Sequence, residues 1–239
     1  DSPTNNYATL NPLAKGSYFT ISEGNTKVVK SSNGWNTILG TQANTSGKWY
    51  FEVAAGPTGS VGTAFIGIGS TTLRYDISNL QDNMTERAKG LLIFCDDGQY
   101  QLDASARTTY SSSITNNDIL ACAFDLDNNT VQFYKNNTAL GSIDISSSTL
   151  ASASIVPLII PYYTGASWTF NFGQSGFTYT PPDGFLALCT ANLPEPSISP
   201  LYGASPQDHF NTVLYTGDGT TSHAITNVGF QPDLVWVKG

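Results

Sequence analysis

The sequence predicts an all-β protein, a β-sandwich of two antiparallel sheets, from three observations. Short β-branched and aromatic runs recur along most of the chain, separated by clusters of Gly, Asn, Asp and Pro. No stretch shows the 3.6-residue period of a long amphipathic helix. The chain has 239 residues, of which 40% are hydrophobic, and this is enough for one large sandwich with a small addition.

The first strong strand signals lie between residues 48 and 102. The run 48–53 is rich in aromatic and β-branched residues, and the run 64–69 adds glycines that indicate a bend or a close backbone approach. The runs 90–95 and 99–102 are separated by Asp-Asp-Gly, which predicts a β-hairpin.

The clearest local pattern follows in residues 118–145. The runs 119–124, 130–135 and 138–143 are joined by short polar turns, which predicts a three-stranded antiparallel meander. The run 155–161 and the run 167–172 supply two further strands. In the second of these, aromatic residues alternate with Thr and Asn, so one face is expected to be apolar and the other polar.

The composition changes after residue 185, where a Pro-rich connector begins. We expect a β-sandwich with an N-terminal arm over 1–193, a Pro-rich linker over 194–208 and the start of a second β module over 209–239. Strands are expected at 210–219 and 233–238. Because so small a strand pair cannot bury a core of its own, the second module is expected to be truncated and the chain to be a piece of a longer polypeptide.

Charge and composition exclude several classes of function. The net charge is −8, and the ten Lys and Arg residues are scattered rather than clustered, so binding to nucleic acid through phosphate contacts is not expected. No apolar stretch approaches the ~20 residues of a membrane-spanning helix. Charged residues make up only 12% of the chain, about half the usual ~25%, so hydroxyl and amide side chains must supply the polar surface.

The three cysteines do not form a disulfide framework. Their number is odd and their spacing wide. Cys95 and Cys122 both lie in apolar runs, which predicts buried thiols. A bridge between them would require neighbouring strands, and the sequence leaves that question open.

Nothing in the predicted sandwich resembles a catalytic or metal site. His209 and His223, the two histidines, lie outside it, so no Ser-His-Asp or Cys-His set can form from local motifs. The acidic run 125–129 carries oxygen ligands of the kind that calcium prefers, but it lacks the Gly and distal Glu of an EF-hand. A hairpin turn explains the same residues, and we predict no catalytic residue, no metal and no cofactor.

Ligand binding through loops is the function that the residues favour. Carbohydrate-binding surfaces combine aromatic faces with amide, carboxylate and other hydrogen-bonding groups, and three loop-like stretches carry such mixtures. The candidate ligand-binding residues are Arg74, Tyr75, Asp76, Arg107, Tyr110, Tyr162 and Tyr163.

Four segments in order resemble the SPRY domain family: 47–53, 66–69, 118–136 and 157–172. One departure is the Asn136-Asn137 turn, where the family often has Asn-Gly. The resemblance implies a concanavalin-like jelly-roll sandwich that recognises proteins or glycans through its loops and performs no catalysis.

The segments on either side of this core resemble more specifically those of SPRY modules in bacteriophage tail and fibre proteins. Residues 1–13 and 184–194 resemble the opening and exit of such modules, and residues 215–238 resemble the start of a lectin-like module. This resemblance implies a non-catalytic virion module for host attachment. Its partners would be a host surface glycan or protein, or neighbouring virion proteins, and tail fibres are often homotrimers.

Two alternatives remain open from the residues. A polysaccharide-degrading tail enzyme would need two carboxylates roughly 5–10 Å apart in a groove. A bacterial cell-surface adhesin would share the same composition.

Overall fold

The structure is a computed structural model, and it describes residues 5–75, 88–194 and 205–238. The chain forms two compact units, Asp1–Asn192 and Leu193–Gly239. Among the residues described, no helix is long and apolar enough to cross a membrane.

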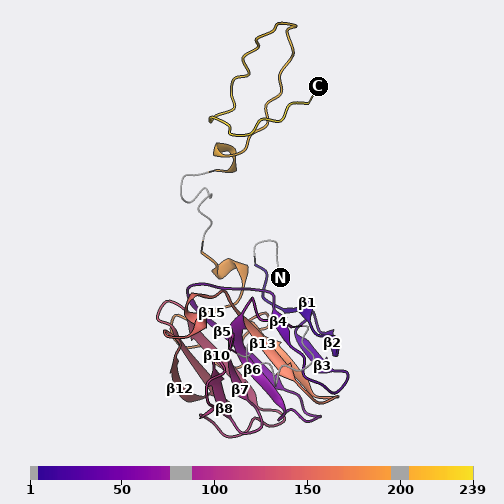
Figure 1. The fold of residues 1–239 in the computed structure, drawn as a ribbon, viewed down its shortest axis with the longest axis vertical. Coiled ribbons are helices and arrows are strands. Elements are labelled where there is room, and N and C mark those ends of the chain that lie inside the picture. The colour runs from indigo at the N-terminus through magenta and orange to yellow at the C-terminus, as the bar shows by residue number, and fades with distance from the viewer. Residues whose placement is uncertain (1–4, 76–87, 195–204, 239) are drawn as a thin grey trace. The chain divides into compact units, whose positions relative to one another are not determined.

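The first unit is a sandwich of two antiparallel sheets (Figure 1). One sheet has the strand order β1-β4-β13-β6-β7-β8-β9, with the bounds β1 Leu10–Lys15, β4 Ile38–Gly40, β13 Ile155–Pro161, β6 Ala64–Ser70, β7 Gly90–Phe94, β8 Gln99–Leu102 and β9 Thr108–Thr109. The other has the order β12-β11-β10-β5-β14-β3-β2, with the bounds β12 Thr138–Asp144, β11 Thr130–Lys135, β10 Ile119–Asp125, β5 Lys48–Ala55, β14 Ser167–Asn171, β3 Lys27–Lys30 and β2 Phe19–Ser22. The short strand β15, Leu186–Ala187, pairs in parallel with β5.

The predicted fold class is confirmed, and so are the strands expected within 48–172. The meander of β10, β11 and β12 pairs as predicted. The first four strands were not predicted individually. They are three to six residues long, too short to display a clear period, yet they complete one side of each sheet.

The main core fills the space between the sheets. Phe51 of β5 lies 6.2 Å from Phe170 of β14 and 6.3 Å from Phe124 of β10, measured between ring centroids. Ile66 and Ile93 face them from the other sheet within the same buried cluster. Burial of these side chains supplies the main driving force for closing the sandwich.

The sheet that contains β6, β7 and β13 is buried on both faces. Every residue of these three strands is buried. Phe65, Leu92 and Leu158 point away from the main core and form a second cluster with Trp35 and Phe94. This double burial explains why the three strands read as continuous apolar runs rather than alternating ones.

The two ends of the sandwich have different roles. At one end the chain enters and leaves, because Ala8 N donates to Leu188 O at 2.8 Å and Asn6 N donates to Thr190 Oγ1 at 2.9 Å. The opposite end, called the loop end below, carries the loops 31–37, 56–63, 95–98, 110–118 and 162–166, which flank paired strand termini. Figure 1 shows the N-terminal end of the sandwich at its upper side.

The three cysteines are free and buried. Cys95 directly follows β7, whereas Cys122 lies in β10 of the other sheet. The prediction of buried thiols is confirmed, and the open question of a Cys95–Cys122 bridge is answered because both thiols are free.

In the second unit, the strands predicted at 210–219 and 233–238 are wrong. Residues 205–238 contain a 3₁₀ turn at Pro206–Asp208 and no paired strand. The side chain of Leu214 is 102% exposed and that of Trp236 is 92% exposed. These apolar runs have strand-like composition, but they lack neighbouring strands with which to form a ladder.

Candidate functional site

A row of aromatic side chains crosses the outer face of the β13-β6-β7 sheet near the loop end. Ring centroids lie 4.2 Å apart between Phe94 and Phe65, and 4.5 Å apart between Phe65 and Trp35. Tyr162 continues the row 5.1 Å from Trp35, and Tyr163 lies 4.9 Å beyond it. We call these five residues the aromatic row.

Arg107 closes one end of the row. Its guanidinium carbon lies 3.6 Å from the centroid of the Phe94 ring, and its Nη1 lies 3.1 Å from Asp97 Oδ2. The stacking contact and the ion pair orient the guanidinium, and cation–π contacts of this kind contribute about 0.5–1 kcal/mol at partly exposed sites. The row therefore ends in an oriented cationic group.

Hydrogen bonds between two loops position the other end. Gly34 N donates to Tyr162 O at 3.0 Å, and Thr164 N donates to Asn33 Oδ1 at 2.8 Å. These bonds join the loop that carries Trp35 to the loop that carries Tyr163. The row is therefore held by backbone contacts as well as by ring packing.

Lys30 supports the same loop from inside. Its side chain is 1% exposed, and its Nζ donates to Asn36 Oδ1 at 2.8 Å, next to Trp35. The ammonium lies 5.1 Å from the Tyr18 ring and 4.8 Å from the Phe19 ring. Burial lowers the pKa of Lys30 from 10.5 to about 8, because removal from water disfavours the charged form.

Exposure differs along the row and marks which groups a partner can reach. Trp35, Phe65 and Phe94 are buried, whereas Tyr163 is 42% exposed and the side chain of Arg107 is 31% exposed. Tyr162 is half-buried. The buried rings thus anchor the row, and Tyr163 and Arg107 present its accessible groups.

The structure brings several predicted site residues together here. Tyr162 and Tyr163 belong to the aromatic row, Arg107 closes it, and Tyr75 packs against the same outer cluster. Arg74 is exposed beside Tyr75. The seventh candidate, Asp76, lies outside the described residues.

Tyr110 lies elsewhere and joins the two sheets. Its ring contacts Tyr100 at 5.2 Å and Phe133 at 6.3 Å. Its hydroxyl accepts the N–H of Phe133 at 3.2 Å and donates to the carbonyl of Gly141. Burial raises the pKa of Tyr110 to about 12. These contacts stabilise the sandwich, and a role of Tyr110 in ligand binding stays a prediction.

Trp35, Phe65 and Phe94 were missing from the predicted site. The sequence contained a signal for Phe65 and Phe94. The runs 64–69 and 90–95 that carry them are apolar throughout and do not alternate between apolar and polar residues. Such runs indicate a sheet covered on both faces. Aromatic residues within them then mark a second packed layer.

Glu52 has a structural role, which its hydrogen bonds define. Its two carboxylate oxygens accept the N–H groups of Thr178 at 2.9 Å and Tyr179 at 2.8 Å, together with the side chains of Asn171 and Tyr50. Glu52 therefore fixes the segment 177–179 on the outside of β5. Glu23 and Glu52 line one pocket, so they form a pair of carboxylates of the kind that a glycoside hydrolase would need. The oxygens of Glu52, however, already accept hydrogen bonds from these four donors.

The acidic run 125–129 forms a hairpin turn. Asp125 Oδ1 accepts the N–H groups of Asp127 at 3.1 Å and Asn128 at 3.0 Å, and its Oδ2 lies 3.2 Å from Lys48 Nζ. Burial alone would raise the pKa of Asp125, but the hydrogen bonds from Asn128 and the charge of Lys48 outweigh it and lower the pKa.

Comparison with known families identifies the sandwich. The SPRY domain model matches residues 48–175, more than half of the chain. The chain belongs to the SPRY domain family. SPRY domains are in general non-catalytic interaction modules. A second model, a domain of unknown function (DUF7483), matches residues 205–239.

The curated relatives are much longer proteins. The chain is 28% identical over 184 residues to the ATP-dependent RNA helicase DDX1 of Xenopus laevis, covering 76% of this chain and 23% of that protein. It is 31% identical over 94 residues to Ddx1 of Drosophila melanogaster, covering 39% of this chain and 13% of that protein. The chain thus spans less than a quarter of either relative.

Solved structures show the same fold. The SPRY domain of human HERC1 matches with a TM-score of 0.55 and 17% identity, covering 67% of this chain and 96% of that one. Stonustoxin matches with a TM-score of 0.55 and 19% identity, covering 69% of this chain and 27% of that one.

Proposed function

We propose that this SPRY module binds a partner protein through the aromatic row and Arg107. The observation that carries the proposal is the row itself: exposed Tyr163 and Arg107 are held on buried rings at the end of the sandwich opposite to the Ala8–Leu188 contact. Tyr and Arg are enriched at the energetic centres of protein interfaces. Their buried supports reduce the entropy lost on binding.

The setting we propose is a virion tail or fibre, where the module would attach to a host surface or contact a neighbouring virion protein. Its support is the resemblance of the flanks 1–13 and 184–194 to phage SPRY modules, together with the low proportion of charged residues. The segment 205–239, matched by the second family model, would open a lectin-like module. The alternative setting is a bacterial surface adhesin.

Binding to a host glycan is a second candidate for the same surface. It is favoured by the accessible ring of Tyr163, whose half-exposed position beside hydroxyl-bearing Thr164 suits stacking on a sugar.

The test compares the protein with Tyr163→Ala and Arg107→Ala. Binding is measured to host cells, to extracted surface polysaccharide and to purified virion proteins. Tyr215→Ala is the matched control, because Tyr215 is 44% exposed and lies in the other unit. We expect both row variants to lose binding to a protein by at least about 10-fold, since interface Tyr and Arg side chains often contribute 2 kcal/mol or more.

The ligand to which the protein and its variants bind distinguishes the protein-binding candidate from the glycan-binding candidate. Retention on polysaccharide alone, lost in Tyr163→Ala, would support the glycan candidate against the protein one. Unchanged binding in both row variants would refute the proposed surface.

A further inference from the structure

A polar pocket lies on the outer face of the sheet that contains β5 and β14. Its floor is formed by Glu52 and Ala54 of β5, Thr169 of β14 and Ile119 of β10. Residues of the turn 23–26 and of the segment 174–178 complete its lining. The volume is about 280 Å³, near the lower end of the range of small-ligand sites, which suits a ligand with the size of one sugar ring.

Hydrogen bonds hold the segment 174–178 against the sheet. Gln174 Oε1 accepts the N–H of Phe172 at 2.8 Å, and Asn171 Nδ2 donates to Gly176 O at 2.8 Å. The segment also receives the bonds from Glu52 described above. This part of the pocket is therefore positioned before a ligand arrives, which reduces the entropy lost on binding.

The turn 23–26 is fixed in the same way. Thr26 donates to Glu23 O from its N–H at 3.3 Å and from its hydroxyl at 2.6 Å. Phe170 N donates to Thr26 O at 2.8 Å, and this bond joins the turn to β14. Both segments that complete the pocket are thus tied to the strands that form its floor.

Three hydroxyl groups of the pocket are available to a ligand. In the part of the chain that the structure describes, the hydroxyls of Thr169, Ser175 and Thr178 have no hydrogen-bond partner. Beside them the half-buried side chains of Ala54 and Ile119 form a small apolar surface. Hydroxyl groups can both donate and accept hydrogen bonds, so this combination matches the O–H groups and the C–H face of a sugar.

The charge of the pocket disfavours acidic ligands. Glu52 is 2% exposed, and its four hydrogen bonds come from uncharged donors. Glu23 lies 2.9 Å from Lys27 Nζ, which compensates one of the two carboxylates. The described residues that line the pocket include no Lys or Arg. A carboxylate or phosphate on a ligand would therefore be repelled.

We propose that this pocket binds a sugar unit without acidic groups, as part of a polysaccharide. The hydroxyls of Thr169, Ser175 and Thr178 would exchange hydrogen bonds with the hydroxyls of the sugar. An amine on the sugar would be attracted to Glu23. The site is separate from the aromatic row, which lies on the other sheet and shares no residue with the pocket.

Two substitutions probe the pocket in different ways. Ser175→Phe would fill it, because Ser175 is exposed at its edge. Thr169→Val would remove one hydroxyl from the floor and keep the shape of the side chain.

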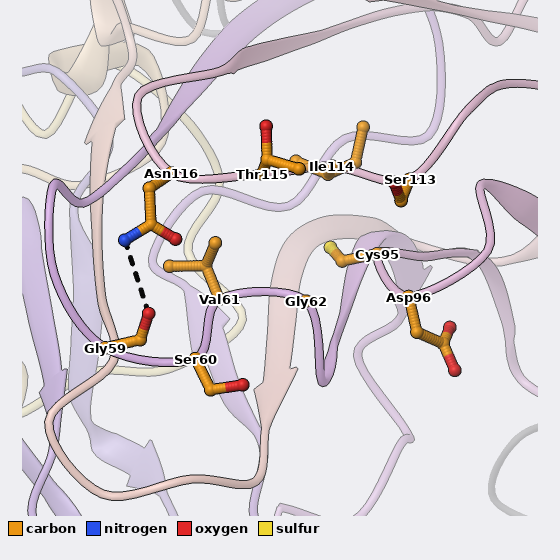
Figure 2. A pocket seen from close by; sticks show the side chains of 10 residues that line it. All are labelled: Gly59, Ser60, Val61, Gly62, Cys95, Asp96, Ser113, Ile114, Thr115 and Asn116. Carbon is orange, nitrogen blue, oxygen red and sulfur yellow. Dashed lines mark hydrogen bonds between the residues drawn. The ribbon is translucent and has the colours of Figure 1, made fainter.

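Another pocket, between the segments 59–62 and 113–116 at the loop end, supplies the control. Figure 2 shows that Ser60 and Asn116 line it together with Asp96, so it also combines hydroxyl, amide and carboxylate groups. Ser60 is exposed, as Ser175 is. Ser60→Phe is therefore the same substitution at an exposed serine of a pocket with similar polar groups.

The experiment applies the full 239-residue chain to an array of oligosaccharides that carry neutral, amine-bearing or acidic sugars. The retained sugars are then titrated into each variant by isothermal titration calorimetry. We expect retention of neutral or amine-bearing sugars and none of acidic ones.

The variants should differ in a defined order. Ser175→Phe should weaken binding by at least about 10-fold through a direct clash, and Thr169→Val by about 3–10-fold, the loss of one hydrogen bond. Ser60→Phe should bind normally. Glu23→Gln should reduce the preference for amine-bearing over neutral sugars by about 2–5-fold, the range of an exposed charge pair.

NMR chemical shifts locate the bound sugar directly. Binding should shift the amide signals of Thr169, Ser175 and Thr178. Retention of acidic sugars alone, or of no sugar, would overturn the proposal, and so would equal losses in Ser175→Phe and Ser60→Phe. Normal binding in Ser175→Phe with a loss in Tyr163→Ala would also overturn it and would support the aromatic row as the glycan site.

Discussion

The buried ammonium of Lys30 predicts an unusual dependence of stability on pH. The side chain is 1% exposed and has one hydrogen-bond acceptor, Asn36, at 2.8 Å. Removal from water lowers its pKa from 10.5 to about 8 in the folded state. The perturbation we choose is Lys30→Met, which keeps the length of the side chain and removes the charge.

The magnitude follows from the two pKa values. Below pH 8 Lys30 is charged in both states, and its burial costs the folded state roughly 3 kcal/mol, at about 1.4 kcal/mol per pH unit. Between pH 8 and 10.5 the unfolded chain binds more protons than the folded one, so this cost disappears as pH rises. From pH 8 to pH 10 the wild type should gain about 2 kcal/mol relative to Lys30→Met.

The assay is urea denaturation of both proteins at half-unit steps from pH 7.5 to pH 10. Tyr50 and Tyr110, whose pKa values are raised by burial, titrate alike in both proteins and cancel in the difference. Lys27→Met, in the same strand, controls for the loss of one charge, because the Lys27 side chain is 36% exposed and its Nζ lies 2.9 Å from Glu23 Oε1 at the surface. If the curves of wild type and Lys30→Met run parallel over this range, the ammonium is not buried as described.

Three further substitutions test the contacts of the sandwich. Glu52→Gln replaces one acceptor oxygen, so the N–H of Thr178 or Tyr179 loses its partner; we expect a loss of about 1–3 kcal/mol in urea denaturation. The folded-state pKa of Asp125 lies below its usual 3.8, so its stabilisation is complete above that pH and is lost as the pH falls through the folded-state pKa. Asp125→Asn should therefore lose less stability than the wild type as the pH falls below about 4. Phe133 is fully buried, so Phe133→Ala should cost about 3–5 kcal/mol, measured by thermal and chemical denaturation.

The strands that the sequence predicts well are those with an unambiguous period or turn. The hairpin β10–β11 has strand runs on both sides of an Asp-rich turn, and its register pairs Cys122 with Phe133. The segments β2 and β3 mix Lys, Ser and Thr with only a few apolar residues, so their pairing depends on β14 rather than on local pattern. The segment 233–238 shows the reverse case, in which a strand-like pattern lacks a partner strand.

The candidate site could be predicted only in part for a similar reason. Tyr162, Tyr163 and Arg107 carry loop-like sequence contexts, and composition was enough to select them. Nothing in the sequence connects Arg107 with Phe94, because their contact depends on the hairpin β7–β8 and on β9 beside it.

In the proposed binding surface, the buried residues that support it differ from the exposed residues that would contact a partner. Trp35 is 7% exposed between Phe65 and Tyr162, so Trp35→Ala should cost about 3–5 kcal/mol of unfolding free energy. Tyr163 meets a partner from its exposed side, and Tyr163→Ala should change stability by less than about 1 kcal/mol. The two variants can be compared by denaturation and by partner binding. If Tyr163→Ala destabilises the fold as much as Trp35→Ala does, Tyr163 is a packing residue, and the SPRY scaffold cannot vary its contact residues independently of its core.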